Sequence, residues 1–211
     1  MSKMTSPVSP LTNRRTQATR RDRSEQGLLA AAADLIVERG LASATFENIG
    51  VRAGYSRGLA TQKFGSKQGM IEHLILRLQT RLQHLLDDRH IEAASGLEAT
   101  LAFIDIYLRS LAEDRKMRAY FILLAGAVAE ASGQRALFAA AHADVERRIE
   151  AMLQRGQIEG NVRGGINPDA AALMIGSMLF GLSMQILLDP DLDLDPIRET
   201  SLSTLRLSFQ A

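Results

Sequence analysis

The sequence predicts an all-α fold with a small N-terminal domain and a larger C-terminal one. Apolar residues recur at intervals of three and four along most of the chain, which is the spacing of amphipathic helices, and no segment shows the alternation of a strand. Glycine, proline and capping residues divide this pattern into separate helices. The 211 residues are 46% hydrophobic and 23% charged, enough for a packed core, and the absence of cysteine excludes disulfide scaffolds and thiolate chemistry.

Charge is distributed unevenly along the chain. Residues 1–67 contain 11 Lys and Arg against 5 Asp and Glu, a net charge of +6, whereas the remainder has a net charge of −5. A basic N-terminal block indicates an anionic partner, either nucleic acid or anionic lipid. Residues 1–23 are predicted to be a disordered basic arm, which is either a solvated tail or a segment that follows DNA. No apolar run follows its arginines, so we expect no secretory signal and a cytoplasmic protein.

The segment 24–67 is predicted to form a domain of three helices, at 24–39, 45–53 and 56–64. Each begins at a hydroxyl residue that can cap it and is followed by glycine. The second and third are too short to be stable alone, so they must pack on the first. The third helix has a polar face without any acidic residue, which suits the major groove of DNA and predicts a helix-turn-helix. This face comprises Arg57, Thr61, Gln62 and Lys63.

The run from Thr45 to Lys67 resembles the DNA-binding segment of the TetR family of transcriptional regulators. The likeness rests on residues at the family's spacing, namely Ala53, Gly54, Ser56, Gly58, Phe64, Ser66 and Lys67, and on the amphipathic helix that precedes them. The chain departs from the family pattern at four positions. The family usually has alanine at the position of Gly50 and a branched apolar residue at that of Tyr55. It usually has a bulky residue at the position of Ala60 and an aromatic one at that of Thr61.

The resemblance implies a role for each polar residue of this segment. Thr45, Ser56 and Lys67 would hold backbone phosphates, and Arg57, Thr61 and Gln62 would approach base edges, with Lys63 able to do either. The chemistry is compatible, because the ammonium of Lys67 and the free N–H groups after Ser66 can share one phosphate. Gln62 can pair with adenine and Arg57 with guanine. The alternative for each residue is a solvated position on a helix surface.

The segment 68–211 is predicted to be a helical domain. Apolar stripes predict helices that begin at 66, 97, 113 and 137, and Asn167-Pro168-Asp169 is a strong start signal for another. Residues 170–188 contain no charged residue, and this run is long enough to span a membrane. Acidic flanks without Lys or Arg favour a subunit interface over a span, and the resemblance places a dimer contact here. With the last helix, which begins at Asp195, the expected interface residues are Leu173, Gly176, Ser177, Phe180, Gly181, Met184, Leu188, Leu202 and Leu205.

By resemblance, the C-terminal domain would sense a small molecule. Its helices can enclose an apolar pocket, but the composition of the candidate residues favours plain core packing over a pocket. Tyr107 and Tyr120 stand out because a buried hydroxyl needs a partner, which an effector can supply. The candidate lining residues are Phe103, Tyr107, Met117, Tyr120, Phe121 and Met178.

The sequence contains no arrangement that indicates an enzyme, a metal site or a cofactor. His84 with Asp88, and His142 with Glu146, stand four apart, but such pairs are usually surface ion pairs. A phosphate-binding glycine loop and a nucleophile elbow are both absent. We therefore expect a homodimeric regulator that binds double-stranded operator DNA, most simply a repressor released by a small-molecule effector. The alternatives are an activator, a membrane-associated protein that uses its arm on anionic lipid, and a helical binding protein that does not bind DNA.

Overall fold

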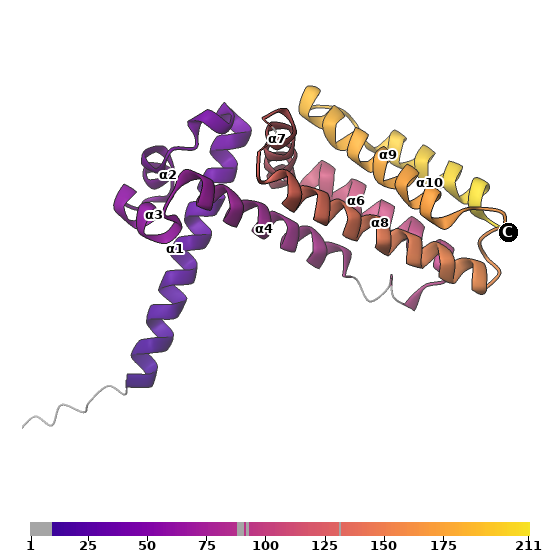
Figure 1. Ribbon diagram of the computed structural model, residues 1–211, viewed down its shortest axis with the longest axis horizontal. Helices are drawn as coiled ribbons and strands as arrows, with labels where there is room; N and C mark the ends of the chain where they lie inside the picture. Colours follow the sequence, from indigo (N-terminus) through magenta and orange to yellow (C-terminus); the bar gives the residue numbers. More distant parts are fainter. Residues whose placement is uncertain (1–9, 88–90, 92, 131) are drawn as a thin grey trace, which may run out of the picture. The chain divides into compact units, whose positions relative to one another are not determined.

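The computed structural model describes residues 10–87, 91, 93–130 and 132–211, and of residues 10–18 the backbone alone (Figure 1). Within this part of the chain there are nine α-helices, in agreement with the predicted all-α fold. The chain divides into two compact units, Met1–Leu74 and Ile75–Ala211. The boundary falls within helix α4 (Lys67–Leu86) instead of at residue 67, because this helix continues from one unit into the other without a break.

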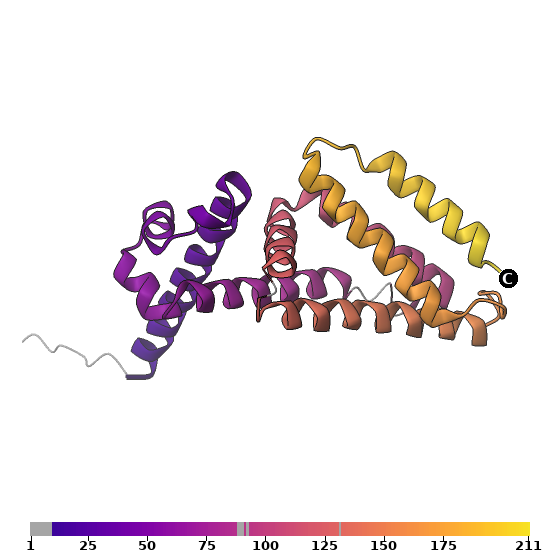
Figure 2. The same cartoon turned by 45° about the horizontal axis from the view of Figure 1, so that its top comes forward.

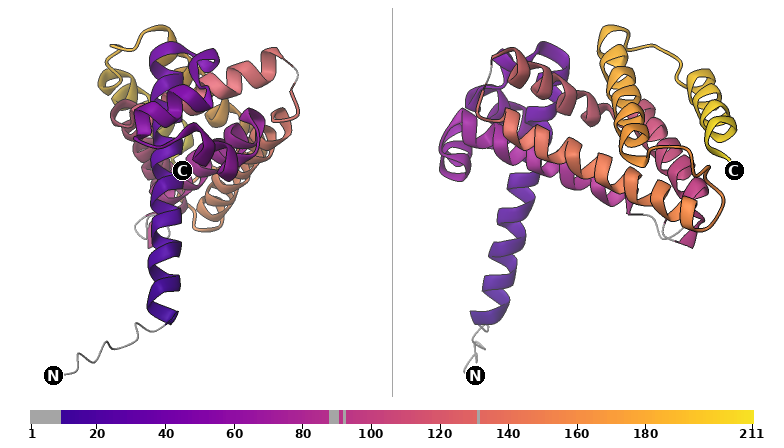
Figure 3. Two further views of the ribbon diagram at one scale, coloured as in Figure 1. Left: turned by 90° about the vertical axis from the view of Figure 1, so that its left-hand side faces the viewer. Right: turned by 45° about the vertical axis from the view of Figure 1, so that its right-hand side comes forward.

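Helix α1 spans Pro10–Arg39 and is longer than predicted. Residues 10–23 were expected to be disordered, but they are helical, and the helix extends well beyond α2 and α3 in every view (Figures 1 and 3). Proline suits the first turn of a helix, and no further proline follows before Gly40. Ser24 is an interior residue whose hydroxyl donates to the carbonyl of Arg21 at 2.9 Å. The rest of the expected arm, residues 1–9, lies outside the described residues.

The two short helices follow their predicted caps. Helix α2 spans Phe46–Ala53 and helix α3 spans Arg57–Phe64, with the 3-10 helix Leu41–Ser43 before them. Gly54 adopts a left-handed conformation with a φ of 71°, which allows the tight turn between α2 and α3. Because neither helix can bury enough surface alone, both pack into one small core with α1. Its fully buried side chains include Leu28, Ile36, Ile49 and Ala60.

The second unit is a bundle of α6 (Gly96–Glu113), α7 (Arg115–Ala129), α8 (Arg135–Ile158), α9 (Pro168–Leu188) and α10 (Asp195–Phe209). Its helices begin close to the predicted starts. Helices α8 and α9 form the most extensive pairing, α6 packs on α8, and α10 packs on α6. Figure 2 shows α7 crossing α8 at a steep angle.

Two glycines let α6 and α8 approach each other closely. A Cβ on Gly96 would lie 2.2 Å from the backbone nitrogen of Gly156, so only glycine fits at Gly96. The N-terminus of α6 is capped from a distance, because the backbone N–H of Gly96 donates to Glu159 Oε2 at 2.7 Å. The N–H of Leu97 likewise donates to Asn161 Oδ1 at 3.0 Å. The loop after α8 thereby holds the start of α6.

Candidate functional site

The N-terminal unit presents an exposed polar surface on α3. Arg57, Thr61 and Gln62 are exposed, as predicted for residues that approach bases, and the Arg57 side chain is 73% exposed. The guanidinium of Arg57 lies 3.8 Å from a carboxylate oxygen of Glu47. The Thr61 hydroxyl donates to the carbonyl of Arg57 at 3.1 Å, a bond within the helix that DNA can replace. Since α3 has no acidic side chain, phosphates would meet no repulsion from it.

The expected phosphate contacts also lie at the surface. The hydroxyl oxygen of Thr45 accepts from the backbone N–H of Asn48, and that of Ser56 accepts from the N–H of Leu59, each at 3.2 Å. A hydroxyl that accepts one bond still has its hydrogen to donate, so both caps can bind a phosphate oxygen. Lys67 is exposed, and its ammonium donates to the carbonyl of Leu41 at 3.0 Å. A solvated lysine can exchange this bond for a phosphate.

Lys63 differs from the prediction, because the structure does not place it on the exposed surface of α3. Its side chain is 6% exposed, and its ammonium donates to the carbonyl of Arg21 at 2.7 Å and lies 3.5 Å from Glu25 Oε2. These contacts attach α3 to α1. The sequence carried a signal for this position, since Lys63 follows the fully buried Ala60 by three residues and therefore lies on the same side of the helix.

The turn between α2 and α3 requires glycine at Gly50. A Cβ at this position would lie 2.8 Å from the carbonyl oxygen of Tyr55 and 3.2 Å from the backbone nitrogen of Arg57. The turn therefore passes closer to α2 than an alanine would allow. This close approach determines where the first residue of α3 stands relative to α2.

The outer surface of α9 is apolar and exposed. Leu173, Met174 and Leu188 are 57%, 51% and 79% exposed, and Ser177 and Gly181 lie between them. A Cβ on Gly181 would meet nothing within 4 Å, so the surface is open there. Of the other expected interface residues, Gly176, Phe180, Met184 and Leu202 are half-buried, and Leu205 is buried within its own unit.

Helix α9 is the helix within the described residues that is long and apolar enough to cross a membrane. Its opposite side carries Ala172, Ile175, Leu179 and Ile186, all buried in the unit. The helix thus has one side in the core and one apolar side uncovered. An uncovered apolar stripe of this kind marks an interaction surface.

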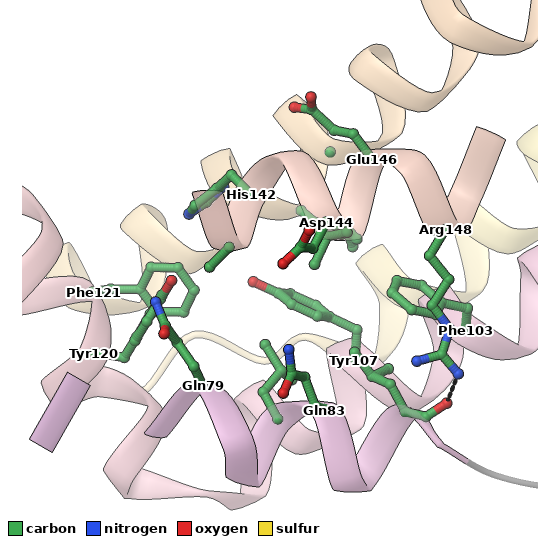
Figure 4. Close-up of a pocket in the computed structure, with 16 residues that line it drawn as sticks. Gln79, Gln83, Phe103, Tyr107, Tyr120, Phe121, His142, Asp144, Glu146 and Arg148 are labelled. Atoms are coloured by element: carbon green, nitrogen blue, oxygen red, sulfur yellow. Dashed lines mark hydrogen bonds between the residues drawn. The ribbon is translucent and has the colours of Figure 1, made fainter. Parts of the chain in front are cut away.

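A cavity opens among the helices of the second unit (Figure 4). The space between its lining atoms is about 810 Å³ when the open solvent at its mouth is included. Helix α4 supplies Gln79, Leu82, Gln83 and Leu86, and α6 and α7 supply four aromatic rings. Helix α8 supplies Ala141, His142, Asp144, Val145, Glu146 and Arg148, and α9 supplies Gly176 and Leu179.

Four of the six predicted lining residues face this cavity, and two do not. Phe103, Tyr107, Tyr120 and Phe121 line it. Met117 is 1% exposed and belongs to the core, and Met178 is half-buried elsewhere on α9. No pattern in the sequence indicated the polar lining from α4 and α8, because polar residues at those spacings are also typical of a solvated helix side.

The tyrosines and the histidine of the cavity are held in their neutral forms. Burial raises the pKa of the Tyr107 phenol far above its ordinary value, although its hydrogen bond with Ser183 Oγ at 2.9 Å opposes this. Burial also raises the pKa of Tyr120 to about 12, against a hydrogen bond with Gln79. Burial lowers the pKa of His142, with Glu146 acting in the opposite direction. At neutral pH these groups therefore add no charge to the cavity.

The charged lining residues are two carboxylates and one guanidinium. Figure 4 shows the Asp144 carboxylate turned toward the middle of the group and that of Glu146 turned away. Arg148 donates to Asp87 Oδ1 at 2.8 Å and to the carbonyl of Leu86, and it lies 5.6 Å from the centre of the Phe103 ring. Its charge is thus already neutralised by a partner. No cluster of three or more metal-binding side chains occurs in the described part of the chain.

The comparisons with known proteins cover both units. Residues 28–74 match the description "Bacterial regulatory proteins, tetR family", and residues 96–208 match "BetI-type transcriptional repressor, C-terminal". The transcriptional repressor Rv3405c of Mycobacterium tuberculosis is 34% identical over 88 residues, which are 42% of this chain and 45% of that protein. The chain thus spans about half the length of the curated relatives it matches.

Solved structures of similar fold cover most of the chain. SmeT, the repressor of a multidrug efflux pump of Stenotrophomonas maltophilia, has a TM-score of 0.72 at 25% identity, over 89% of this chain and 90% of SmeT. A transcriptional regulator from Saccharomonospora viridis, solved with choline, has a TM-score of 0.78 at 18% identity, over 90% of this chain and 99% of that one. These relatives are regulators and not enzymes. The chain belongs to the TetR family of bacterial regulatory proteins.

Proposed function

We propose that the protein is a homodimeric, cytoplasmic repressor that binds a palindromic operator through α3 and releases it when a small molecule occupies the cavity of the second unit. The observation that carries the proposal is the exposed, acid-free surface of α3, with Arg57, Thr61 and Gln62 uncovered and the capping residues Thr45 and Ser56 also exposed. In this arrangement Arg57 reads guanine, Gln62 reads adenine, and Thr45, Ser56 and Lys67 hold phosphates. Repression is the activity of two named relatives.

Dimerisation is proposed through the exposed side of α9 together with α10. A single α3 touches few bases, and two copies related by a twofold axis reach successive major grooves about 34 Å apart. The stripe of Leu173, Ser177, Gly181 and Leu188 supplies an apolar surface on one side of a long helix. A second copy of the same stripe would bury it in a closed, symmetric contact.

Release by an effector follows from a difference in affinity between two conformations. A ligand that binds more tightly to a conformation unsuited to the operator lowers operator affinity by that same difference. The cavity suits this role because it is concave and largely apolar, with a few polar groups that can orient a ligand. Helix α4, which lines the cavity, is also the helix that leads into the DNA-binding unit.

The decisive experiment is selection of bound sequences from a random DNA pool. A palindrome with half-sites about one helical turn apart is expected, together with a mass near twice 23.1 kDa in solution. A single unrepeated half-site would contradict the dimeric arrangement, and absence of any enriched sequence would contradict specific operator binding. A reporter gene placed behind the selected sequence then distinguishes repression from activation by the sign of the change.

A further inference from the structure

We propose that residues 10–23 of α1, the basic extension, form a second DNA-binding surface. It binds backbone phosphates of the duplex that flanks the half-site read by α3. The inference rests on the proposed function in taking α3 as the helix that enters the major groove. It is drawn from the charge of the basic extension, its lack of an apolar side and its attachment to α3.

The basic extension carries positive charge that the described part of the chain does not neutralise. It contains five arginines and one acidic residue, Asp22, so its net charge is +4. Arg20, Arg21 and Arg23 are exposed, and none of them forms an ion pair with another described residue. Arg20 and Arg23 stand three apart in the helix, where like charges repel and weaken it. A row of phosphates removes this repulsion, so the basic extension complements a polyanion.

The composition of the basic extension favours DNA over a lipid surface. A helix that lies on a membrane needs an apolar side that enters the boundary of the acyl chains. Between Pro10 and Arg23 the apolar residues are Leu11 and Ala18, which are too few to form such a side. Binding to phosphates along a duplex requires positive charge alone.

Lys63 attaches the end of the basic extension to α3. Its ammonium donates to the carbonyl of Arg21 at 2.7 Å and lies 3.5 Å from Glu25 Oε2, and its side chain is 6% exposed. The hydroxyl of Ser24 donates to the same carbonyl at 2.9 Å. Because Lys63 lies in the last turn of α3, the basic extension leaves the small core beside the C-terminal end of that helix.

The basic extension is long enough to reach phosphates outside the half-site. Figure 3 shows α1 continuing toward its N-terminus beyond α2 and α3 as one helix. At a rise of 1.5 Å per residue, residues 10–23 span about 20 Å, or roughly six base pairs of duplex. A helix of this length that starts at the end of α3 extends past the bases that α3 touches. Phosphate contacts carry no sequence information, so the basic extension adds affinity and leaves base preference to α3.

Two duplexes of different length test the proposal. Both carry the operator obtained by selection, and one of them has about ten further base pairs of arbitrary sequence at each end. Binding to the full-length protein is measured at several salt concentrations. We expect the longer duplex to bind about tenfold more tightly at about 0.1 M salt, with a salt slope steeper by about two units or more. Equal affinities and equal slopes overturn the proposal.

Variants assign this gain from the flanks to the arginines. Arg20→Gln combined with Arg23→Gln removes two charges and retains helix propensity. On the longer duplex it should lower the salt slope by about two units and the affinity several-fold. Its affinity for the short duplex should stay within about twofold, an outcome that unfolding would not give. The matched control is Arg135→Gln with Arg147→Gln, both exposed on α8, and it should retain the full gain. Retention of the full gain without Arg20 and Arg23 contradicts their role.

Ala18→Pro distinguishes a helical surface from a flexible basic tail. Proline in a helix interior costs about 3 kcal/mol and kinks or breaks the helix, but here it leaves every arginine in place. We expect this variant to lose most of the gain from the flanks. Full retention of the gain overturns the helical surface, because a flexible tail would then be sufficient.

Vesicles of phosphatidylglycerol and phosphatidylcholine test the other anionic partner. We expect no binding of the protein to them at about 0.1 M salt, since the basic extension lacks an apolar side. Vesicle binding that is lost in Arg20→Gln with Arg23→Gln, together with no gain from DNA flanks, would assign the basic extension to a membrane surface and overturn the proposal.

The failure of this inference and that of the proposed function are separable. A selected operator without any gain from its flanks refutes the second DNA-binding surface alone. If no sequence is enriched, the proposed function fails, and the arginine variant is then compared with the unaltered protein on a long duplex of random sequence. A lower salt slope of the variant on that duplex supports the basic extension as a phosphate-binding surface, and an unchanged slope refutes it as well.

Discussion

The ring of Tyr55 lies directly against Gly27 of α1, where a Cβ would stand 3.2 Å from Tyr55 Cε2. The TetR-family pattern usually has a branched apolar residue at the position of Tyr55, and here a larger ring occupies it. The missing side chain at Gly27 provides the space. The α2–α3 turn is thus positioned on α1 by a pair of residues that depend on each other.

Gly27→Leu should destabilise the protein by about 1–3 kcal/mol, because the added side chain overpacks against the ring of Tyr55. The measurement is thermal or denaturant unfolding. Tyr55→Val in the same chain should recover most of the loss by removing the ring, so the two changes should be strongly non-additive. Additive effects would show that the two residues do not depend on each other.

Gly50→Ala should destabilise the N-terminal unit by about 1–3 kcal/mol, because its Cβ would meet the Tyr55 carbonyl oxygen at 2.8 Å. The same variant should also bind the operator more weakly, because the added Cβ forces the start of α3 to shift. Gly58→Ala is the control, because its Cβ would meet only Ser56 Oγ, at 3.8 Å. That control should be neutral or stabilising by up to about 1 kcal/mol through helix propensity. Equal losses in both variants would contradict the steric explanation.

Lys63→Met should lower stability and leave the preference for DNA sequence unaltered, because the ammonium of Lys63 binds the Arg21 carbonyl within the unit.

Gln62→Ala should relax preference at one base position, and Lys67→Ala should weaken binding to all sequences and lower the salt slope by about one unit. The measurements are sequence selection and binding at several salt concentrations. A changed base preference of the Lys63→Met variant would show that Lys63 contacts DNA.

Glu159→Gln should reduce stability at neutral pH but not in acid. The pKa of the Glu159 carboxyl lies below 4.5, mainly because it accepts a hydrogen bond from the backbone N–H of Gly96 and a second one from the side chain of Asn161. Burial raises this pKa, and the charge of Arg155 lowers it. A carboxyl with a lowered folded-state pKa stabilises the fold above its unfolded pKa of about 4.5 and loses that contribution as pH falls further. Unfolding free energies of both proteins, measured from pH 7 into acid, should therefore converge as pH falls below 4.5 and through the folded-state pKa of Glu159. A constant difference across this range would contradict the assignment.

Gly181→Arg should convert the proposed dimer to a monomer, because the arginine projects from the open side of α9, where a Cβ meets nothing within 4 Å. Light scattering should report a mass near 23.1 kDa instead of twice that value. Gly164→Arg is the matched control, since its Cβ also meets nothing within 4 Å but the residue lies outside α9 and α10. A dimer that survives Gly181→Arg would place the interface elsewhere.

Local signals in the sequence were sufficient for most helix limits and for the helix-turn-helix. Thr45, Ser56 and Asn167 cap helices where their side chains predicted it, because a capping bond joins residues two or three apart and needs no distant partner. The same local signals failed for residues 10–23, where the many arginines and threonines predicted disorder. Those residue types are also compatible with a helix.

The side-chain roles that depend on distant segments were decided by packing. Lys63 meets Arg21 across 42 positions, Gly96 meets Glu159 across 63, and Tyr107 meets Ser183 across 76. The cavity combines residues of five helices, and its carboxylates came from helix positions that periodicity alone assigns to solvent. Helical periodicity indicates which residues share one side of a helix, but the packing of the helices determines which segment that side contacts.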